Sequence, residues 1–571
     1  MKATDYIVRF LIDRGIKDIF GYPGGVICHL MDSAQKYANE IAAHIHYHEQ
    51  AAAFAGCAYA QTKSLATAVY ATSGPGAVNL MTGVANAYFD SIPLIFFTGQ
   101  VDTYALRPFA ELRQYGFQET DIVSMAKGIT KYCKRIDDAK TLPDELERAW
   151  QIAHEGRPGP VLLDLPADVQ RSDIKVVLAS APDVANPGNV SYAATTILQS
   201  LQQAKRPCLL LGGGIKSIGL VDQARSLIHQ WNIPTVFSLP AFDILPWNDP
   251  LNLGFIGANG HRSANFAVAK CDLLITLGTR LDLKQVGNTR SKFAPQARIL
   301  RVDIDQTELK CSIHPNVEAL QVDLKPLLPL LLEGEIESTQ EDNWQHWRNI
   351  CTELIQRIKE ADCKDIQHQC ISALSDRIST CGGITIDVGQ HMLWTSQALK
   401  IQQGQRVCMS AGLGSMGYSL PASIGLYYAI HRPVVCVNGD GGLQMNLQEL
   451  QFIKRERLPI TVVVMNNHAL GMIRQFQEEN FMNNYMQTTL MSGYSAPDFE
   501  RIAYAYEIPY YRITSPKDLS SFSLSESGPA FLDVMLPEQT YLLPKFNAKS
   551  VLHDQIPALD RAEFEYLEHL S

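Results

Sequence analysis

Several features are missing from the sequence, and each absence narrows what the protein can be. The 12 cysteines stand alone, with no C-x-x-C pair, and residues 1–14 show neither the basic head nor the apolar core of a secretory signal. These two absences predict a protein that stays in the reducing cytoplasm. The longest apolar runs, Leu327–Leu332 and Tyr418–Ile430, are shorter than the ~20 residues that a membrane span needs, so we expect no transmembrane helix.

An excess of basic residues is also missing. Lysine and arginine number 49 against 59 aspartates and glutamates, so the net charge of −10 would repel a polyanion, and nucleic acid is not an expected partner. At roughly 150 residues per domain, the length of 571 residues favours three or four domains and excludes a small binding module. The 46% hydrophobic and 19% charged residues are ordinary for a globular protein and exclude intrinsic disorder.

Short apolar runs that end in glycine-rich or polar turns alternate with amphipathic stretches along the chain. This alternation is typical of βα units around a parallel sheet that is buried on both faces. The predicted strands are Leu65–Ala71, Pro93–Thr98, Pro160–Leu165, Pro207–Leu211, Leu273–Leu277, Ile299–Val302, Thr385–Val388, Pro433–Val437, Ile460–Met465 and Ala530–Val534. The fold class that we predict is therefore α/β, with three doubly wound parallel-sheet domains.

Composition sets the predicted boundaries of these domains. We expect an N-terminal domain over residues 1–175, a central domain over 190–335, a C-terminal domain over 345–540 and a tail over 541–571. Ser180–Ser191 is rich in Pro, Ser, Asn and Ala and is predicted to be a linker. The acidic stretch Glu333–Asp342 is predicted to be a solvated connector, and the polar end of the chain from Glu538 is expected to lie over the surface.

Two polar clusters follow neighbouring predicted strands in the third domain. Asn438-Gly439-Asp440-Gly441-Gly442 follows the first strand, and Asn466-Asn467 closes the second, with an amphipathic helix predicted over Leu447–Arg455 between them. In one βαβ unit both clusters lie at the carboxyl ends of adjacent strands, where open α/β sheets bind ligands. Asp440 and Asn467 offer the hard oxygen ligands that Mg²⁺ shares with diphosphate and water, and the glycines allow the backbone to approach a phosphate.

A tight turn followed by an asparagine helix cap would also account for each cluster taken alone. The spacing of 27 residues from Asp440 to Asn467, together with the strand context, favours a metal-diphosphate site. This arrangement resembles the motif of thiamine diphosphate (ThDP) enzymes. The resemblance implies that the N-terminal domain binds the pyrimidine of ThDP, that the C-terminal domain binds its diphosphate with Mg²⁺, and that the central domain is Rossmann-like.

Two further features are similar to those of ThDP enzymes. His48-Glu49-Gln50 enters the apolar segment AAAFAGCAYA, and the resemblance implies that Glu49 is the catalytic acid on the aminopyrimidine ring. Alone, a glutamate at this place would be favourable helix-dipole electrostatics. In Ser410–Gly417 the resemblance implies that Met416 supports the bent cofactor and that the Gly414 carbonyl accepts from its amino group, although a methionine is equally suited to filling a core.

Several segments resemble one branch, the acetolactate (acetohydroxyacid) synthase catalytic subunits. These segments are Phe20–Gly25, Thr72–Gly76, Phe97–Val101, Phe117–Asp121, Gly156–Pro160, Gly212–Gly214, Leu277–Arg280 and Leu470–Met472. The resemblance covers nearly the whole chain to about residue 535. It implies catalytic positions at Glu49, Gln100 and Gly25, cofactor contacts that include Gly439, Gly441, Gly442, Gly471 and Met472, and a metal site of Asp440, Asn467 and Ala469.

One dipeptide that would favour a different reaction is absent. No two histidines are adjacent, whereas simple 2-oxo acid decarboxylases of this superfamily use a His-His pair to protonate the carbanion. A carboligase instead keeps the carbanion unprotonated until a carbonyl acceptor arrives, so a site poor in acids suits it. Gln100 then resembles the polar glutamine near the pyruvyl carbon.

The central domain resembles the one that holds FAD in these synthases. Arg157, Gly213, Arg280 and Asp282 match positions of that binding region. The Gly-Met-His-Gly segment of the biosynthetic enzymes is Gly257–Gly260, with sequence GANG, in this chain. This departure leaves FAD open.

Three more departures concern the acceptor. Phe476 stands where biosynthetic synthases have a tryptophan that favours 2-oxobutyrate, Ala167 replaces a lysine, and Lys284 replaces an arginine. A smaller aromatic ring loosens the acceptor pocket, and lysine lacks the planar, bidentate carboxylate recognition of arginine.

The predicted activity is a ThDP- and Mg²⁺-dependent carboligase that decarboxylates pyruvate and transfers the acetyl unit to a second carbonyl, most simply a second pyruvate to give acetolactate. The alternatives are a related carboligase with another acceptor, such as a ketosugar nucleotide, and a non-catalytic homologue. The resemblance implies a homodimer or tetramer with active sites at the subunit interface, and it leaves a regulatory subunit open.

Overall fold

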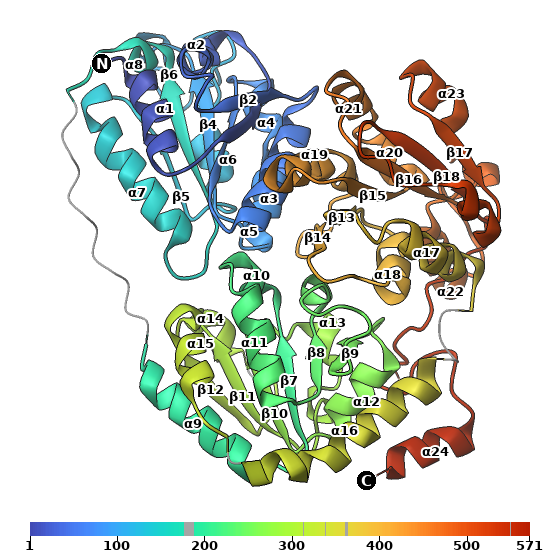
Figure 1. The fold of residues 1–571 in the computed structure, drawn as a ribbon. Helices are drawn as coiled ribbons and strands as arrows, with labels where there is room; N and C mark the ends of the chain where they lie inside the picture. The colour runs from blue at the N-terminus through green and yellow to red at the C-terminus, as the bar shows by residue number, and fades with distance from the viewer. Residues whose placement is uncertain (176–187, 312, 337, 360–363, 549, 571) are drawn as a thin grey trace.

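Three parallel β-sheets form the centres of three units of the chain (Figure 1). The computed structural model describes residues 1–175, 188–311, 313–336, 338–359, 364–548 and 550–570. Each sheet has six strands, every strand pair within it is parallel, and helices pack on both faces. The α/β fold class predicted from the sequence is confirmed.

The N-terminal sheet has the strand order β2-β1-β3-β4-β6-β5. Its strands are β1 (Asp18–Gly21), β2 (Ala42–Ile45), β3 (Thr67–Ala71), β4 (Leu94–Gln100), β5 (Tyr132–Arg135) and β6 (Pro160–Pro166). Its helices are α1 (Ala3–Asp13), α2 (Cys28–Lys36), α3 (Glu49–Lys63), α4 (Pro75–Asn79), α5 (Met81–Phe89), α6 (Ile122–Ala126), α7 (Leu142–His154) and α8 (Ala167–Arg171).

The central sheet has the order β12-β11-β10-β7-β8-β9. Its strands are β7 (Pro207–Leu211), β8 (Thr235–Phe237), β9 (Asn252–Phe255), β10 (Leu273–Leu277), β11 (Arg298–Asp303) and β12 (Val317–Gln321). The accompanying helices are α9 (Val190–Gln203), α10 (Gly213–Ser217), α11 (Val221–Trp231), α12 (Arg262–Lys270), α13 (Leu283–Val286), α14 (Gln306–Lys310), α15 (Leu324–Glu333) and α16 (Ser338–Lys359).

The C-terminal sheet has the order β14-β13-β15-β16-β18-β17. Its strands are β13 (Gly383–Ile386), β14 (Arg406–Met409), β15 (Val434–Gly439), β16 (Ile460–Asn466), β17 (Tyr510–Ile513) and β18 (Ala530–Met535). Helices of this part of the chain are α17 (Ile366–Arg377), α18 (Gln390–Ala398), α19 (Ser419–Ile430), α20 (Asp440–Gln444), α21 (Leu450–Arg455), α22 (Gly471–Asn480), α23 (Phe499–Ala505) and α24 (Arg561–His569).

The ten strands predicted from apolar runs are all present, and they form the middle of each sheet. Strand β13 ends two residues earlier than predicted, because the Asp387 carboxylate there accepts hydrogen bonds from backbone groups. The helix predicted over Leu447–Arg455 begins with a 3₁₀ turn, η6 (Leu447–Glu449), before α21. Most of the predicted linker lies outside the described residues, and α15 and α16 extend into the acidic connector from its two sides.

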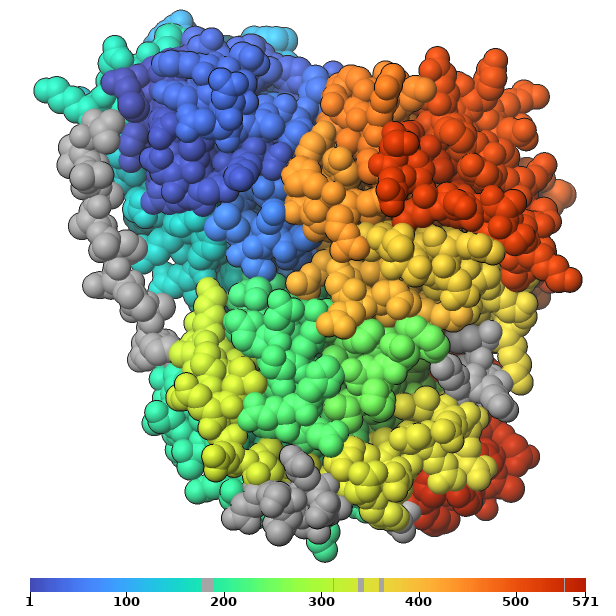
Figure 2. All heavy atoms as spheres, viewed as in Figure 1, coloured from blue at the N-terminus to red at the C-terminus, as the bar shows by residue number. Residues whose placement is uncertain are grey.

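The most extensive contact between the N-terminal and C-terminal units is the pair α3 and α19 (Figure 1), and the two units touch where blue and orange atoms meet in Figure 2. Both helices are buried around most of their circumference, as expected for a helix placed between two sheets. A Cβ atom added to Gly425 of α19 would lie 1.9 Å from the carbonyl oxygen of Ala55 in α3, so only glycine allows this approach. The two units therefore share one apolar core.

The end of the chain does not simply lie over the surface, which corrects one sequence-based expectation. Thr540, Leu542 and Gln555 are buried, and the Gln555 amide donates to the carbonyls of Ala258 and Gly260 at 3.2 Å. Helix α24 packs against α16 at the base of the central unit (Figure 1). Among the described residues, no helix is long and apolar enough to cross a membrane.

A buried ion pair lies where the three units meet. Lys216 in α10 donates to both carboxylate oxygens of Asp243 at 2.8 and 2.9 Å and to the Val407 carbonyl of β14 at 2.8 Å. Asp243 accepts from the Val407 N–H at 2.8 Å, and the Ser64 hydroxyl at the end of α3 donates to the Lys216 carbonyl at 3.0 Å. Both charged side chains are almost fully buried, so each depends on the other for its electrostatic stabilisation.

We expect Lys216→Met to lower the free energy of unfolding by about 3–5 kcal/mol, because it leaves the Asp243 carboxylate buried and unpaired. The midpoint of thermal unfolding measures this loss, and replacing Asp243 by leucine in the same chain should restore part of it. The matched control is Lys454→Met, whose ion pair with Glu507 is exposed and is worth at most about 1 kcal/mol. Equal effects of the two lysine variants would contradict the assignment.

Candidate functional site

Asp440 lies at the carboxyl edge of the C-terminal sheet, directly after β15. Its carboxylate accepts from the Tyr494 hydroxyl at 3.2 Å, and the backbone N–H groups of Gly441 and Ala469 lie near it. The side chain is almost completely buried, and burial raises its pKa to about 7. A buried carboxylate without a basic partner is a group that a bound cation would stabilise.

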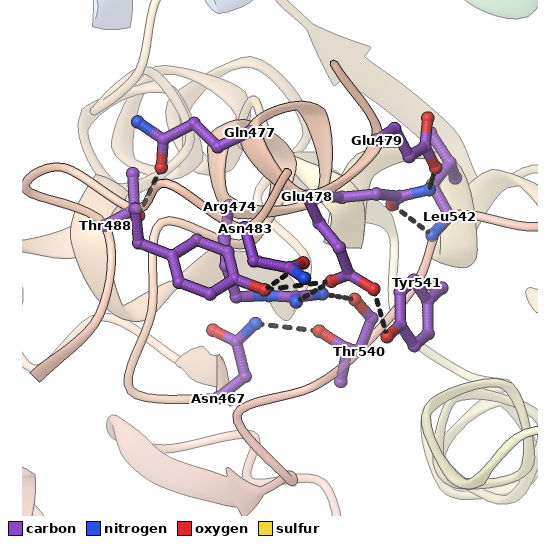
Figure 3. A network of polar contacts seen from close by, with 12 residues as sticks. Asn467, Arg474, Gln477, Glu478, Glu479, Asn483, Thr488, Thr540, Tyr541 and Leu542 are labelled. Carbon is purple, nitrogen blue, oxygen red and sulfur yellow. Dashed lines mark hydrogen bonds and ion pairs between the residues drawn. The ribbon is translucent and has the colours of Figure 1, made fainter. Parts of the chain in front are cut away.

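Asn467 follows the adjacent parallel strand β16 and lies beside Asp440. Its Oδ1 accepts from the Ala469 N–H at 3.3 Å, and the same N–H lies next to the Asp440 carboxylate. Its Nδ2 donates to the Thr540 hydroxyl at 2.8 Å (Figure 3). The structure thus brings together the three residues predicted to bind metal, Asp440, Asn467 and Ala469, as the βαβ topology requires.

The glycines around these residues are packed so closely that a side chain would not fit. A Cβ atom on Gly441 would lie 2.6 Å from Leu470, and one on Gly471 would lie 2.2 Å from the Gln390 amide oxygen. Gly439 and Gly442 flank Asp440 and Gly441 in the same turn, and Met472 is the second residue of α22. Apart from the 410–417 loop, the predicted diphosphate residues therefore come from the end of β15 and from the segments that follow β15 and β16.

His391 and Gln390, which sequence reasoning missed, border the same edge of the sheet. They begin α18 after β13, which is the other neighbour of β15. A Cβ atom on Gly439 would lie 2.9 Å from the His391 ring. Burial lowers the pKa of His391 to about 3, so its ring is neutral, and its buried Nε2 has no hydrogen-bond partner among the described residues. The signal in the sequence was the polar stretch DVGQH after a predicted strand.

This edge of the sheet fits a divalent cation with a diphosphate. It offers carboxylate and amide oxygens of the type that Mg²⁺ binds, and a buried His391 ring nitrogen that has no hydrogen-bond partner among the described residues. No group of three or more His, Cys, Asp or Glu side chains that could hold a metal alone occurs in the described part of the chain. A cation here would therefore need ligand oxygens from the diphosphate or from water.

Met416 lies beside this turn, since its Cε is 3.5 Å from a Cβ atom built on Gly441. Gly414 adopts a positive φ of 74°, and its exposed backbone is accessible to a ligand. The Asp387 carboxylate accepts from the Gly417 N–H at 3.0 Å and so fixes the end of the loop before α19. The loop is therefore placed next to Asp440 by the same sheet edge.

The N-terminal unit also holds this loop. Asn86 of α5 accepts a hydrogen bond from the Ser410 hydroxyl at 2.5 Å, and Asp90 accepts from the Gly412 N–H at 2.6 Å. Burial raises the pKa of Asp90 to about 7. Both units of one chain thus contribute to the position of Met416.

Glu49 is the first residue of α3 and is 8% exposed. Its Oε2 accepts from the Asn79 side chain at 3.0 Å, and its Oε1 lies 3.1 Å from a Cβ atom built on Gly76. Among the described contacts, the residues around the Glu49 carboxylate differ from those around Asp440. The two carboxylates therefore belong to separate parts of one chain.

Gln100 is buried, whereas Gly25 is exposed. Gln100 ends β4, and its amide donates to Asp164 at 3.0 Å and to the Thr120 carbonyl at 2.7 Å, so its polar atoms are used inside the N-terminal unit. Gly25 begins the 3₁₀ helix η1 (Gly25–Ile27), is exposed, and has nothing within 4 Å of an added Cβ atom. Only Gly25 offers open space to a substrate.

The arginines that resemble part of a flavin site are paired with carboxylates. Arg157 donates to the Ser91 hydroxyl at 2.8 Å, to Asp305 at 3.2 Å and to Glu308 at 2.7 Å. These two carboxylates come from the start of α14, so the arginine links the N-terminal and central units. Its cationic group is therefore paired with two carboxylates of this chain.

Arg280 is paired with a carboxylate as well. Arg280 donates to Asp282 at 3.3 Å, and Asp282 caps α13 by accepting from the Lys284 N–H at 2.8 Å. Gly213 begins α10 in a turn that packs against Gly278. Both arginines are thus paired with carboxylates within the chain, and a flavin site stays a prediction.

Comparisons with known proteins agree with this geometry. Three family models match: the thiamine pyrophosphate enzyme N-terminal TPP binding domain over residues 1–125, the central domain over 194–331 and the C-terminal TPP binding domain over 387–534. The chain is 35% identical to acetolactate synthase isozyme 2 large subunit of Escherichia coli over 95% of this chain and 97% of that protein. It is 34% identical to the acetolactate synthase large subunit of Lactococcus lactis (96% and 94%) and 33% identical to chloroplastic acetolactate synthase 1 of Zea mays (97% and 88%).

The buried Asp164 carboxyl generates a prediction for pH dependence. Burial raises its pKa from 3.8 to about 7, while hydrogen bonds from Thr98 and Gln100 act in the opposite direction. The folded protein therefore binds this proton more tightly than the unfolded chain. Titration of the Asp164 carboxyl therefore lowers the free energy of unfolding as pH rises from about 4 to about 7. The loss is on the order of 4 kcal/mol.

We expect Asp164→Asn to make this fall less steep, measured as the midpoint of thermal unfolding across that pH range. The substitution is tolerable because the Thr98 hydroxyl can rotate to accept from the new amide. Asp32→Asn is the control: this exposed carboxyl has its pKa held below 3.8 by Lys2, so the fall between pH 4 and 7 should remain. An unchanged slope in the Asp164 variant would refute the assignment.

Proposed function

The chain belongs to the thiamine pyrophosphate enzyme family, as an acetolactate synthase-type enzyme, and on that basis we propose that it decarboxylates pyruvate and transfers the acetyl unit to a second carbonyl compound. With pyruvate as acceptor, the product is acetolactate. The observation that supports this most strongly is the group of buried polar atoms from Asp440, Asn467 and His391 at one sheet edge.

The diphosphate half of the cofactor would be held by the C-terminal unit. Asp440 and Asn467 would give two oxygen ligands to Mg²⁺, and the neutral His391 ring would hydrogen-bond a phosphate oxygen through the Nε2 that lacks a partner. When bound, thiamine diphosphate supplies a nucleophilic carbon and accepts the electron pair that remains when carbon dioxide leaves. Met416 would support its bent form from below.

Glu49 would hold and move a proton at the aminopyrimidine ring. Its position at the buried start of α3, with Asn79 on one carboxylate oxygen, orients the group and restricts water. A site poor in other acids protects the acetyl donor from protonation before the acceptor arrives.

The identity of the acceptor depends on the pocket wall around Phe476. Phe476 on α22 is 54% exposed, and its ring contacts Phe481 at a centroid distance of 5.9 Å. An open wall of this kind accommodates pyruvate, and a larger carbonyl compound such as a ketosugar nucleotide is the second candidate. A cytoplasmic location remains a prediction from the sequence alone.

Large apolar side chains remain exposed on the two units that would share a cofactor. In the N-terminal unit Phe109 and Phe117 are exposed, and in the C-terminal unit Met482 and Met491 are exposed. Faces of this kind are typical of subunit interfaces. The proposed assembly is a dimer or tetramer in which Glu49 of one subunit faces Asp440 of another.

We expect incubation with pyruvate alone to give acetolactate at the rate of pyruvate consumption, measured by product analysis. The reaction should depend on added thiamine diphosphate and Mg²⁺. Slow turnover that a second carbonyl compound accelerates would support the other acceptor class. Calorimetry that shows no binding of the cofactor with Mg²⁺ would favour a non-catalytic homologue and overturn the proposal.

We expect Glu49→Gln to keep the fold and cofactor binding yet to lose pyruvate consumption by orders of magnitude, because the amide cannot exchange a proton with the ring. Asp440→Asn should also be inactive, through weaker metal binding. Co-expression of the two variants with different tags tests the shared site: a hybrid dimer has one site without either substitution. Hybrids without activity would show that both residues serve the same chain's site.

A further inference from the structure

Thr540 lies between two amide side chains that border the proposed metal site, those of Asn467 and Gln390, and Figure 3 shows its contact with Asn467. Its hydroxyl accepts from Asn467 Nδ2 at 2.8 Å and donates to Gln390 Oε1 at 2.9 Å. The residue is 3% exposed and belongs to the irregular segment after β18. One buried hydroxyl thus connects the residue after β16 with the residue that begins α18.

Backbone groups fix the direction of every hydrogen bond in this network. The Leu542 N–H donates to Gln475 Oε1 at 2.8 Å, so that atom must be an oxygen. Gln390 Nε2 donates to this same oxygen at 2.9 Å and to the Thr540 carbonyl at 3.1 Å, so the other amide atom of Gln390 must be its oxygen. Two backbone groups that cannot be reversed therefore set the orientation of both glutamines.

The same hydrogen bonds fix the amide orientation of Asn467, the residue proposed to bind the metal. Because Gln390 presents its oxygen, the single proton of the Thr540 hydroxyl is used for that bond, and the hydroxyl can only accept from Asn467. Asn467 must then present Nδ2 to Thr540 and Oδ1 to the opposite side, where Ala469 N–H and Asp440 lie. An amide is nearly symmetric in shape, so only hydrogen bonds distinguish this orientation from the reverse.

We propose that Thr540 is a positioning residue that orients the Asn467 amide so that its oxygen faces the Mg²⁺ of the cofactor site. The inference rests on the proposed function, since it gives Asn467 the role of a metal ligand. The reversed amide would direct an NH₂ group at the cation and lose a ligand oxygen. Partners of metal ligands commonly affect metal affinity in this way.

The segment around Thr540 is held in place by contacts that do not involve the Thr540 hydroxyl. The Thr540 carbonyl accepts from Arg474 at 2.6 Å, and the Tyr541 hydroxyl donates to Glu478 at 2.8 Å. The Leu542 N–H adds a third contact to α22. A side chain of the same shape without the hydroxyl leaves these contacts in place.

The test compares Thr540→Val with Thr540→Ser. Calorimetric titration of the cofactor-free full-length protein with Mg²⁺ at saturating thiamine diphosphate measures metal affinity without turnover. We expect Thr540→Val to weaken Mg²⁺ binding by about tenfold and Thr540→Ser to restore it. In activity assays, the Mg²⁺ concentration for half-maximal rate should rise while kcat at saturating Mg²⁺ changes little.

A matched control removes another buried hydroxyl. Thr235 in β8 is fully buried and donates to the Ile233 carbonyl at 3.2 Å, far from this site in the central unit. Thr235→Val should leave Mg²⁺ affinity unchanged. Equal Mg²⁺ affinity of wild type and Thr540→Val, equal losses in the Val and Ser variants, or an equal loss in the control would overturn the inference. Absence of cofactor binding in the wild type would instead overturn the proposed function.

Discussion

The packing of α3 against α19 is the contact on which the rest of the site depends. At Gly425 the helices approach so closely that no side chain fits, and both are buried around most of their circumference. Glu49 begins α3, and the loop of Gly414 and Met416 leads directly into α19. One rigid helix pair therefore sets the positions of Glu49, the residue proposed to transfer a proton, and Met416, the proposed cofactor support, which lie more than 360 residues apart in the sequence.

The central strands could be predicted from the sequence because burial on both faces demands continuous apolar runs. Strands β4, β7 and β16 are buried along their whole length. The strands that were missed are short or lie at sheet edges, such as β2 and β12, where exposed positions mix polar with apolar residues. Edge strands carry no pattern that distinguishes them from loops, so their existence follows from the assembled sheet and not from local sequence.

Proximity of site residues could be predicted only for strands that are consecutive in the chain and also adjacent in the sheet. Asp440 and Asn467 follow consecutive strands that are also neighbours in the sheet, so a βαβ argument places them together. His391 comes from the other neighbour of β15, and Thr540 comes from an irregular segment, so neither proximity follows from spacing along the chain. For Gln100 the motif gives the residue but not its direction, because Asp164 becomes its neighbour only through the pairing of β4 with β6.

The electrostatics of the sheet edge explain why a cation and an anion would bind there together. Asp440 is buried, and its described contacts are a hydroxyl and backbone N–H groups, none of which carries a full positive charge. Ionising it without a cation costs free energy, as its raised pKa shows. A diphosphate alone would add repulsion, whereas a divalent cation between the two satisfies both. The same argument makes the orientation of Asn467 consequential, because in a dry site a reversed amide dipole is not screened by water.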